Sequence, residues 1–397
     1  MLPRTAYLDQ LNSFRDKQLI KVITGIRRCG KSTLLDIFQE ELLSNGVQNA
    51  QIIAINFEDA DFEDLLDRKT LNAYIKSHLL SDRMNYIFLD EIQHVFEWPK
   101  VVDSLFIKRN CDVYITGSNA YLLSGELATL LSGRYVEIKM LPLSFAEYVS
   151  AFPDKSGLDR KYRAYLINSS FPYTLELNKP KDIHAYLDGV YTSVILKDVV
   201  SRKKIADVSA LESVIRFMFD NIGNICNAKK IADTMTSAGR KISVHTVESY
   251  LTALCDSFIL YKTGRFDIKG KQYLKTGEKY YIADIGLRYY LLGAEKADMG
   301  RALENVIYLE LRRRGYDARI GKVGNAEVDF IATHASEVEY YQVALSVRDK
   351  NTLVRELAPL NSISDHNQKF LLTLDDDPPA SYNGIKQLNA LDWLIGQ

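Results

Sequence analysis

Hydrophobic positions in the first third of the chain fall into short, largely apolar runs that are separated by stretches of mixed polarity. The runs cover residues 19–24, 51–57, 86–89 and 111–117. Apolar runs of this length are typical of strands that are buried on both faces of a parallel sheet. After the first run, residues 33–38 place apolar side chains at helical spacing. The pattern therefore predicts an α/β fold in which parallel strands alternate with helices.

A glycine-rich motif joins the first predicted strand to the first predicted helix. Residues 25–32 match the G-x-x-x-x-G-K-[ST] pattern of a phosphate-binding loop, or P-loop. Backbone N–H groups of such a loop surround a phosphate, Lys31 is expected to reach the β- and γ-phosphates, and Ser32 to supply an oxygen to Mg²⁺. The flanking strand and helix favour this interpretation over a plain glycine-rich turn. The residues expected to contact the nucleotide are Gly25, Arg28, Gly30, Lys31, Ser32 and Thr33.

The third apolar run ends in two acidic residues, Asp90 and Glu91. An apolar strand followed by Asp-Glu is the Walker B pattern, and a parallel sheet delivers both carboxylates to its carboxyl edge, where ligands bind. We expect Asp90 to hold Mg²⁺ through water and Glu91 to act as the general base for the attacking water. Acidic residues are common at strand ends, so the preceding P-loop is what makes this interpretation specific.

The fourth run ends in Ser118 and Asn119, which the expected sheet brings next to the carboxylates. A polar residue at this point is placed to sense the γ-phosphate or to orient water, and the sequence does not choose between the two. Ser and Asn are also preferred at helix N-caps, so a capping role stays open for both.

With these motifs, the chain resembles the bacterial and archaeal AAA-type ATPases that carry an uncharacterised C-terminal domain. The matching residues are the 25–32 loop with Arg27-Arg28, Leu89-Asp90-Glu91, Thr116-Gly117-Ser118, Gly133-Arg134, and Pro142-Leu143-Ser144-Phe145 with Glu147. The resemblance implies an ASCE-type P-loop sheet and Mg²⁺-dependent hydrolysis of ATP to ADP and phosphate. It also implies an arginine finger or γ-phosphate sensor, for which Arg134 is the candidate, with a surface salt bridge as the alternative. The sequence has no N-K-x-D guanine motif, which agrees with ATP rather than GTP.

Changes in pattern along the chain predict further regions after the ATPase core. The four expected regions are an ATPase core at 1–150, a helical lid or connector at 151–205, a winged helix-turn-helix at 206–295 and a nuclease-like α/β domain at 296–397. The winged helix is expected from three helical segments followed by strands at 258–262 and 279–283. Between these strands lie the basic residues Arg265, Lys269, Lys271 and Lys275. This local basic excess favours contact with DNA phosphates, whereas packing or protein docking is the alternative use of such a module.

The last region resembles the PD-(D/E)XK nuclease fold. Glu304 and Asp329 match the helix glutamate and the strand aspartate of that pattern. The E-x-K position reads Gln342-Val343-Ala344, so one metal ligand is weakened and the lysine is missing. Metal-dependent hydrolysis needs a dense set of ligands. We therefore expect a degenerate scaffold rather than an active nuclease.

Composition and charge narrow the class of protein. The chain has 397 residues, is 47% hydrophobic and 25% charged, and has a formal net charge of -1, so it lacks a global basic field. Its four cysteines are scattered, which suggests neither a zinc site nor a disulfide framework and fits the cytoplasm. The N-terminus does not read as a signal peptide and no apolar run is long enough to cross a bilayer, so we expect no membrane partner.

Two functions of different class follow from the sequence. In the first, the chain is a nucleic-acid-dependent ATPase whose winged helix and nuclease-like domain grip DNA. In the second, it is a nucleotide-controlled switch that turns over slowly and signals to a protein partner. The basic hairpin favours the first, and the near-neutral charge and the lost E-x-K motif favour the second. Assembly into an oligomer, with Arg134 acting in trans, is left open.

Overall fold

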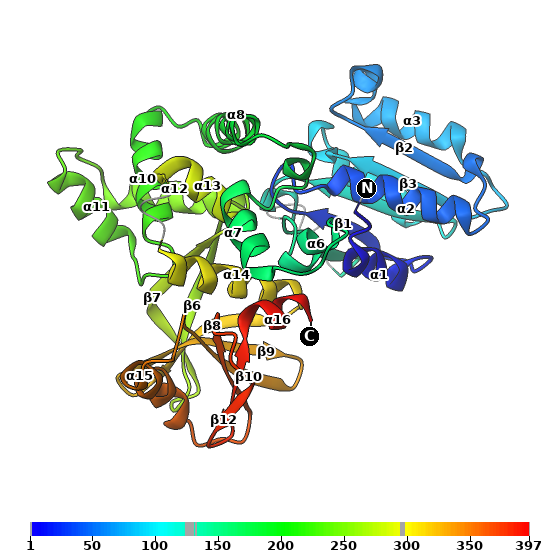
Figure 1. The fold of residues 1–397 in the computed structure, drawn as a ribbon. Helices are drawn as coiled ribbons and strands as arrows, with labels where there is room; N and C mark the ends of the chain where they lie inside the picture. The colour runs from blue at the N-terminus through cyan, green and yellow to red at the C-terminus, as the bar shows by residue number, and fades with distance from the viewer. Residues whose placement is uncertain (1, 124–130, 132, 294–297, 397) are drawn as a thin grey trace. The chain divides into compact units, whose positions relative to one another are not determined.

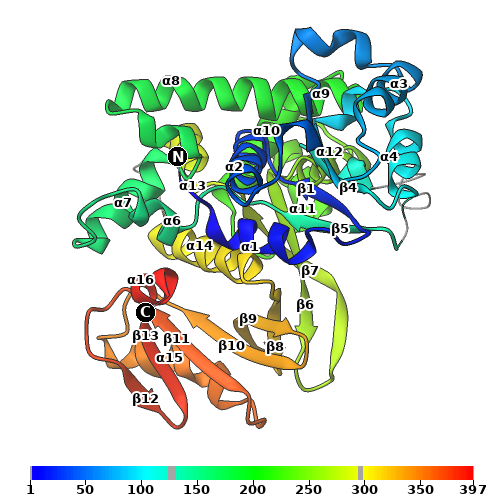
Figure 2. The ribbon, with the colours of Figure 1, turned by 90° about the vertical axis from the view of Figure 1, so that its right-hand side faces the viewer.

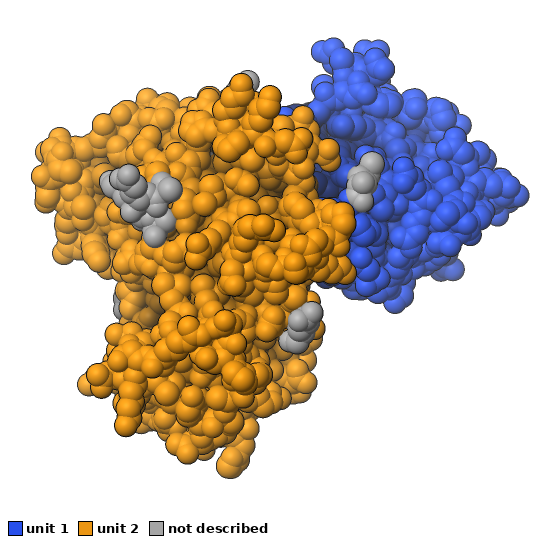
Figure 3. Space-filling model, viewed as in Figure 1, with its two compact units in different colours: residues 1–140, 256–258 blue, residues 141–255, 259–397 orange. Residues whose placement is uncertain are grey.

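The computed structural model describes residues 2–123, 131, 133–293 and 298–396. The chain divides into two compact units, residues 1–140 with 256–258 and residues 141–255 with 259–397, which Figure 3 shows in different colours. Each unit has its own sheet and its own hydrophobic core.

The first unit is built on a five-stranded parallel sheet (Figure 1). Its strands are β1 (Ile20–Thr24), β2 (Ile52–Asn56), β3 (Asn85–Asp90), β4 (Cys111–Gly117) and β5 (Tyr135–Lys139). Their order is β2-β3-β4-β1-β5, and every residue of β1 and β3 is buried, as the apolar runs predicted. The predicted α/β fold is confirmed, and β4 lies between the P-loop strand and the Walker B strand, as the ASCE arrangement requires.

Helices cover this sheet and complete its core. They are α1 (Thr5–Phe14), α2 (Lys31–Ser44), α3 (Arg68–His78) and α4 (Trp98–Phe106). Phe38 of α2 packs against the rings of Phe88 on β3 and Tyr114 on β4, with centroid distances of 6.3 and 5.3 Å. Because α2 starts directly after the P-loop, this aromatic packing fixes the loop relative to the sheet.

The strand register brings the functional segments to one edge of the sheet. Thr24 at the end of β1 lies opposite Gly117 of β4 and Lys139 of β5, and Asn56 of β2 lies opposite Asp90 of β3. The carboxyl ends of parallel strands form the edge at which ligands bind in such sheets. The segments that follow β1, β3 and β4 therefore converge there.

The second unit combines a helical part with an α/β part. Its helices are α6 (Phe145–Ser150), α7 (Leu158–Asn168), α8 (Pro180–Val190), α9 (Asp198–Lys203), α10 (Val208–Asp220), α11 (Ala228–Ser237), α12 (Val244–Asp256), α13 (Ile285–Leu292), α14 (Met299–Arg313), α15 (Lys350–Asn361) and α16 (Ala390–Ile395). Several begin at an Asp or Asn whose side chain accepts hydrogen bonds from the first turn, as Asp207, Asn227 and Asp284 do. Such caps satisfy backbone donors that a helix start leaves unpaired.

An eight-stranded mixed sheet forms the core of the α/β part. Its strands are β6 (Leu260–Asp267), β7 (Gln272–Ile282), β8 (Asp317–Val323), β9 (Ala326–His334), β10 (Glu337–Val343), β11 (Gln368–Thr373), β12 (Ala380–Tyr382) and β13 (Ile385–Asn389). The strand order is β12-β13-β11-β10-β9-β8-β6-β7. Helix α14 packs against β7, β8, β9 and β10, and α15 packs against β9, β10, β11 and β13 (Figure 2).

The β6–β7 hairpin differs from the short hairpin that the sequence predicted. Both strands are longer than expected, and β6 pairs in parallel with β8 through Arg265–Ile320, Phe266–Gly321 and Asp267–Lys322. The hairpin expected as the wing of a winged helix is therefore continuous with the C-terminal sheet. Pairing between residues so distant in sequence leaves no local pattern, which is why the sequence did not indicate it.

Candidate nucleotide-binding site

The P-loop follows β1 and ends at the first turn of α2. Gly25 has φ 155° and Gly30 has φ 100°, which are backbone conformations that residues with a Cβ rarely adopt. A Cβ on Gly25 would lie 2.2 Å from the carbonyl oxygen of Met140, just after β5. Both glycines of the motif are thus required by the backbone, and Gly25 also by the close approach of the neighbouring chain.

Lys31 lies inside the loop and is nearly buried. Its Nζ donates to the carbonyl oxygen of Gly25 at 3.1 Å and lies 3.5 Å from Oε1 of Glu91. The ammonium therefore bridges the P-loop and the Walker B segment. A triphosphate bound in the loop would compete with Glu91 for this charge.

The side chains of Asp90 and Ser32 lie together and offer oxygen ligands for a metal ion. Asp90 accepts hydrogen bonds from the hydroxyls of Ser32 and Thr116. Burial raises the pKa of Asp90 above its ordinary value, although these two hydrogen bonds act in the opposite direction. A carboxylate in contact with a hydroxyl is a donor set that fits a hard cation such as Mg²⁺. The two residues expected to hold Mg²⁺ are therefore brought together.

Glu91 is nearly buried and is held by several partners. Its backbone lies in the left-handed region, at φ 53°, and its N–H donates to Oγ1 of Thr116 at 2.8 Å. Its carboxylate pairs with Lys31 and accepts from the side-chain amide of Gln93 and from the hydroxyl of Ser118. Burial raises the pKa of Glu91, but Lys31 and these hydrogen bonds outweigh it, so the pKa lies below its ordinary value. The carboxylate is thus ionised at neutral pH, as a general base must be.

The two polar residues after β4 have different contacts. Ser118 is hydrogen-bonded to Glu91. Asn119 accepts from the backbone N–H of Leu122 at 3.1 Å and so caps the short turn Ala120–Leu123. Ser118 therefore lies at the site, whereas the side chain of Asn119 makes the capping contact that was its alternative role.

Arg134, the candidate arginine finger, forms an ion pair with Asp103 and lies over the ring of Phe106, 5.4 Å from its centroid. Its side chain is 43% exposed. This is the surface salt bridge that the sequence left open. A role in catalysis stays a prediction, and it requires Arg134 to leave Asp103.

The remaining expected contacts lie around the P-loop. Arg28 is exposed and has φ 67°, and Thr33 is exposed in the first turn of α2. Arg27 forms an ion pair with Glu58 at 2.8 Å, in the segment after β2. Glu58, Glu91 and His94 have ligand atoms within 4.8 Å of one another, which the sequence did not indicate.

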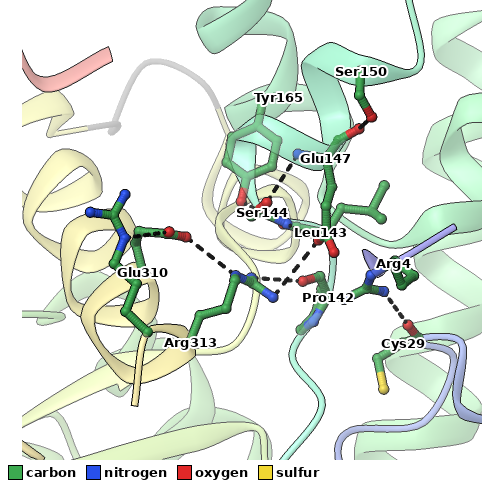
Figure 4. Close-up of polar contacts among 11 residues, drawn as sticks. Arg4, Cys29, Pro142, Leu143, Ser144, Glu147, Ser150, Tyr165, Glu310 and Arg313 are labelled. Atoms are coloured by element: carbon green, nitrogen blue, oxygen red, sulfur yellow. Dashed lines mark hydrogen bonds and ion pairs between the residues drawn. The ribbon is translucent and has the colours of Figure 1, made fainter. Parts of the chain in front are cut away.

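Several residues outside the predicted set hold the site residues in place through hydrogen bonds, and the sequence did not indicate them. Arg4 is nearly buried, and its Nη1 donates to the carbonyl oxygen of Cys29 in the P-loop at 3.1 Å (Figure 4). Thr116 was matched only as part of a motif, yet its hydroxyl links the side chain of Asp90 to the backbone of Glu91. Gln93 likewise restrains Glu91. Arg4 lies far from Cys29 in sequence, so no local signal could have identified it.

The segment 142–147, part of the resemblance, has a structural role in the second unit. Ser144 caps α6 in a reciprocal capping box with Glu147. Arg313 of α14 donates to the carbonyl oxygen of Pro142 at 2.8 Å and lies 3.8 Å from Glu147 (Figure 4). Tyr165 of α7 donates to the carbonyl oxygen of Leu143 at 2.9 Å. The motif therefore anchors the start of the second unit to α7 and α14.

Comparisons with known proteins agree with this geometry. A family model described as an AAA domain matches residues 17–149, and one described as a domain of unknown function (DUF8612) matches residues 159–298. An uncharacterised protein of Haemophilus influenzae is 41% identical over 399 residues, covering 100% of this chain and 99% of that protein. An uncharacterised protein of Methanocaldococcus jannaschii is 31% identical over 351 residues, covering 84% of this chain and 76% of that protein.

One solved structure shares the fold at low identity. It is a Walker-type ATPase of Pyrococcus abyssi, with 15% identity, a TM-score of 0.52, and coverage of 73% of this chain and 96% of that one. Within the part of the chain that the structure describes, none of the helices is long and apolar enough to cross a membrane.

Proposed function

This chain belongs to a family of AAA-type P-loop ATPases in which a domain of unknown function follows the AAA domain, and we propose that it hydrolyses ATP to ADP and phosphate with Mg²⁺. The observation that carries the proposal is the convergence of Lys31, Ser32, Asp90 and Glu91 at one edge of the parallel sheet. A P-loop alone supports nucleotide binding, and the ionised, buried Glu91 beside it supports hydrolysis.

Each residue has a separate part in the proposed reaction. The P-loop backbone and Lys31 bind the phosphates, and Ser32 and Asp90 would hold Mg²⁺, which neutralises charge on the β- and γ-phosphates when bound. Glu91 accepts a proton from the attacking water, and Ser118 orients the Glu91 carboxylate. Competition of the triphosphate for Lys31 frees Oε1 of Glu91 for that water.

Phosphate release by the purified protein with ATP and Mg²⁺ tests this function. Wild type is expected to turn over, and Lys31→Ala to lose turnover because the γ-phosphate then lacks its cation. Glu63→Gln, at an exposed position, is a matched control that should turn over like wild type. Turnover that survives Lys31→Ala would contradict the assignment of the site.

Coupling of ATP hydrolysis to DNA is the finer part of the proposal. Lys269 and Lys271 are exposed in the turn between β6 and β7, and Tyr273 beside them is 67% exposed. Arg319 of β8 lies over the ring of Tyr273, 4.5 Å from its centroid. Cations next to an exposed aromatic ring suit contact with phosphates and with unstacked bases. The side chain of Lys275 lies outside the described residues.

Salt dependence distinguishes this coupling from protein signalling. The double variant Lys269→Gln, Lys271→Gln is expected to weaken DNA binding. The slope of the logarithm of the binding constant against the logarithm of the salt concentration should become shallower, as expected for the loss of about two phosphate contacts. Lys76→Gln, an exposed lysine of α3, is the control. Binding that ignores salt, or a double variant that behaves like the control, would contradict DNA coupling.

A slow nucleotide switch that signals to a protein is the second candidate. It is favoured by the contacts of Glu91, because Lys31 and Gln93 engage both of its carboxylate oxygens. Gln93→Ala is expected to raise turnover if this restraint limits the rate. Unchanged turnover, together with stimulation by DNA, would remove the reason for this alternative.

A further inference from the structure

The second unit contains a lysine enclosed by carboxylates that come from different elements. Nζ of Lys279 on β7 lies 3.0 Å from Oε1 of Glu304 on α14 and 2.8 Å from Oε1 of Glu327 on β9. Asp329, two residues further along β9, also acts electrostatically on Lys279. Glu304 and Asp329 are the residues that matched a nuclease pattern in the sequence, whereas Lys279 lies outside that pattern.

The surroundings of Glu304 leave little room for a further ligand. Tyr281 donates to Oε1 of Glu304 at 2.6 Å, so this oxygen is shared by the phenol and the ammonium. On another side, a Cβ added to Gly223 would lie 3.2 Å from Oε2 of Glu304. The side chain of Lys279 is only 5% exposed. The ammonium and the carboxylate therefore form an enclosed pair rather than a surface ion pair.

Gln342, at the third position of the nuclease pattern, forms hydrogen bonds with other residues of the same domain. The amide of Gln342 donates to Oε2 of Glu356 at 2.9 Å, and its oxygen lies 3.4 Å from the backbone N of Asp329. Asp329 itself accepts from the backbone N–H of Val343 at 2.8 Å. The carboxamide of Gln342 and Oδ2 of Asp329 thus already have hydrogen-bond partners within the domain.

The negative charge of the cluster is partly offset by the lysine. Burial lowers the pKa of Lys279, but the nearby Glu304, Asp329 and Glu327 together raise it by more. The pKa of Lys279 therefore lies above its ordinary value, and the side chain is protonated. Within the described residues, acidic or histidine ligand atoms gather within 4.8 Å of one another at Glu58, Glu91 and His94. The carboxylates around Lys279 are instead spread around the ammonium.

We propose that the ε-ammonium of Lys279 is the resident cation of this carboxylate cluster, filling the place that a divalent ion would need and closing the cluster to metals. The assignment does not depend on the ATPase activity. It also gives the β6–β7 hairpin a function within the fold, because Lys279 ties β7 to α14 and β9. The ion pairs of Lys279 then stabilise the C-terminal region as a structural domain.

Binding of Mn²⁺ to the nucleotide-free protein tests the proposal. Electron paramagnetic resonance of free Mn²⁺ counts the bound ions in wild type, Lys279→Met, Lys279→Met with Asp329→Asn, and Lys262→Met. Lys279→Met is expected to gain one Mn²⁺ site relative to wild type, and the double variant to lose it again. Lys262→Met, which removes an exposed lysine of β6, should bind as wild type does. A folded Lys279→Met protein that gains no site would overturn the proposal.

A second measurement needs only variants that keep the positive charge. In ¹⁵N-lysine NMR of the wild type, Lys279 is expected to give a protected ammonium signal, assigned by its loss in Lys279→Arg. Millimolar Mn²⁺ should leave this signal sharp, because no ion binds beside it. Strong paramagnetic broadening of this ammonium, relieved by Glu304→Gln, would mean that wild type binds the metal and would overturn the proposal.

Discussion

Lys31 in the first compact unit and Lys279 in the second both lie beside carboxylates, and their surroundings differ. Lys31 lies 3.5 Å from Glu91 in a loop whose glycines leave backbone N–H groups available to an anion. Lys279 lies within 3.0 Å of both Glu304 and Glu327 and is enclosed by protein. We expect the first lysine to exchange its carboxylate for a phosphate, whereas the second is held between two carboxylates. Both sites combine a lysine with carboxylates, so residue type alone does not distinguish them. The difference lies in the backbone conformation around the lysine and in the number of carboxylates that contact it.

Removal of the second lysine should have the largest effect on stability. Lys279→Met removes a buried ammonium and leaves the partly buried carboxylates of Glu304 and Glu327 without their cation, which is expected to lower the free energy of unfolding by about 3–5 kcal/mol. Chemical denaturation measures this change. Lys262→Met, at an exposed ion pair with Glu278, should cost less than about 1 kcal/mol. Equal losses in both variants would mean that Lys279 stabilises the domain no more than an exposed lysine does.

Removal of the first lysine should instead affect ligand binding. Lys31→Ala is expected to weaken ATP binding by about 10- to 100-fold, because a charge-assisted hydrogen bond contributes about 1.5–3 kcal/mol. Calorimetric titration with ATP and Mg²⁺ measures the affinity, with Lys76→Ala as the surface control. The comparison of the two lysines fails if Lys31→Ala binds ATP as tightly as the control does.

The pH dependence of stability sharpens the comparison at Asp329. Burial, followed by the charge of Glu304, raises the pKa of Asp329 to about 8, well above the ordinary value near 4. The folded state therefore binds more protons than the unfolded state between these pH values, so stability should fall as pH rises through this window. Asp329→Asn should reduce the fall, which is at most about 1.4 kcal/mol per pH unit for one group.

Denaturation curves at several pH values check this prediction. Asp376→Asn, at an exposed position, is the control and should leave the slope of wild type unchanged. A slope that Asp329→Asn does not alter would show that Asp329 is already ionised in the fold near neutral pH.

The smallest effect is expected for the surface pair in the ATPase unit. Arg134→Ala removes a half-exposed ion pair with Asp103, so the free energy of unfolding should change by less than about 1 kcal/mol. Asp103→Ala should cost a similar amount. If Arg134→Ala lowers turnover by about 10³-fold while Asp103→Ala does not, the arginine acts as the finger that the resemblance implied.

The parts of the site that sequence predicted are those encoded locally. The P-loop and Asp90-Glu91 are contiguous motifs at strand ends, and the sequence alone predicts both. Arg4 and Lys279 were not identified, because each acts on partners at least 25 residues away and a single basic residue carries no signal. Four strands of the first sheet, β1 to β4, follow from apolar runs. The fifth strand, β5, was not among the predicted runs, and the β6–β8 pairing depends on contacts that no run reveals.

The Glu91→Gln variant separates ATP hydrolysis from ATP binding at the P-loop site. Phosphate release is measured for wild type and Glu91→Gln at saturating ATP, with bound ATP quantified in the same samples. We expect Glu91→Gln to retain ATP and to lose turnover by about 10²–10⁴-fold, because glutamine cannot accept the proton of water. Turnover within a few-fold of wild type, at equal ATP occupancy, would contradict the assignment of Glu91 as the general base.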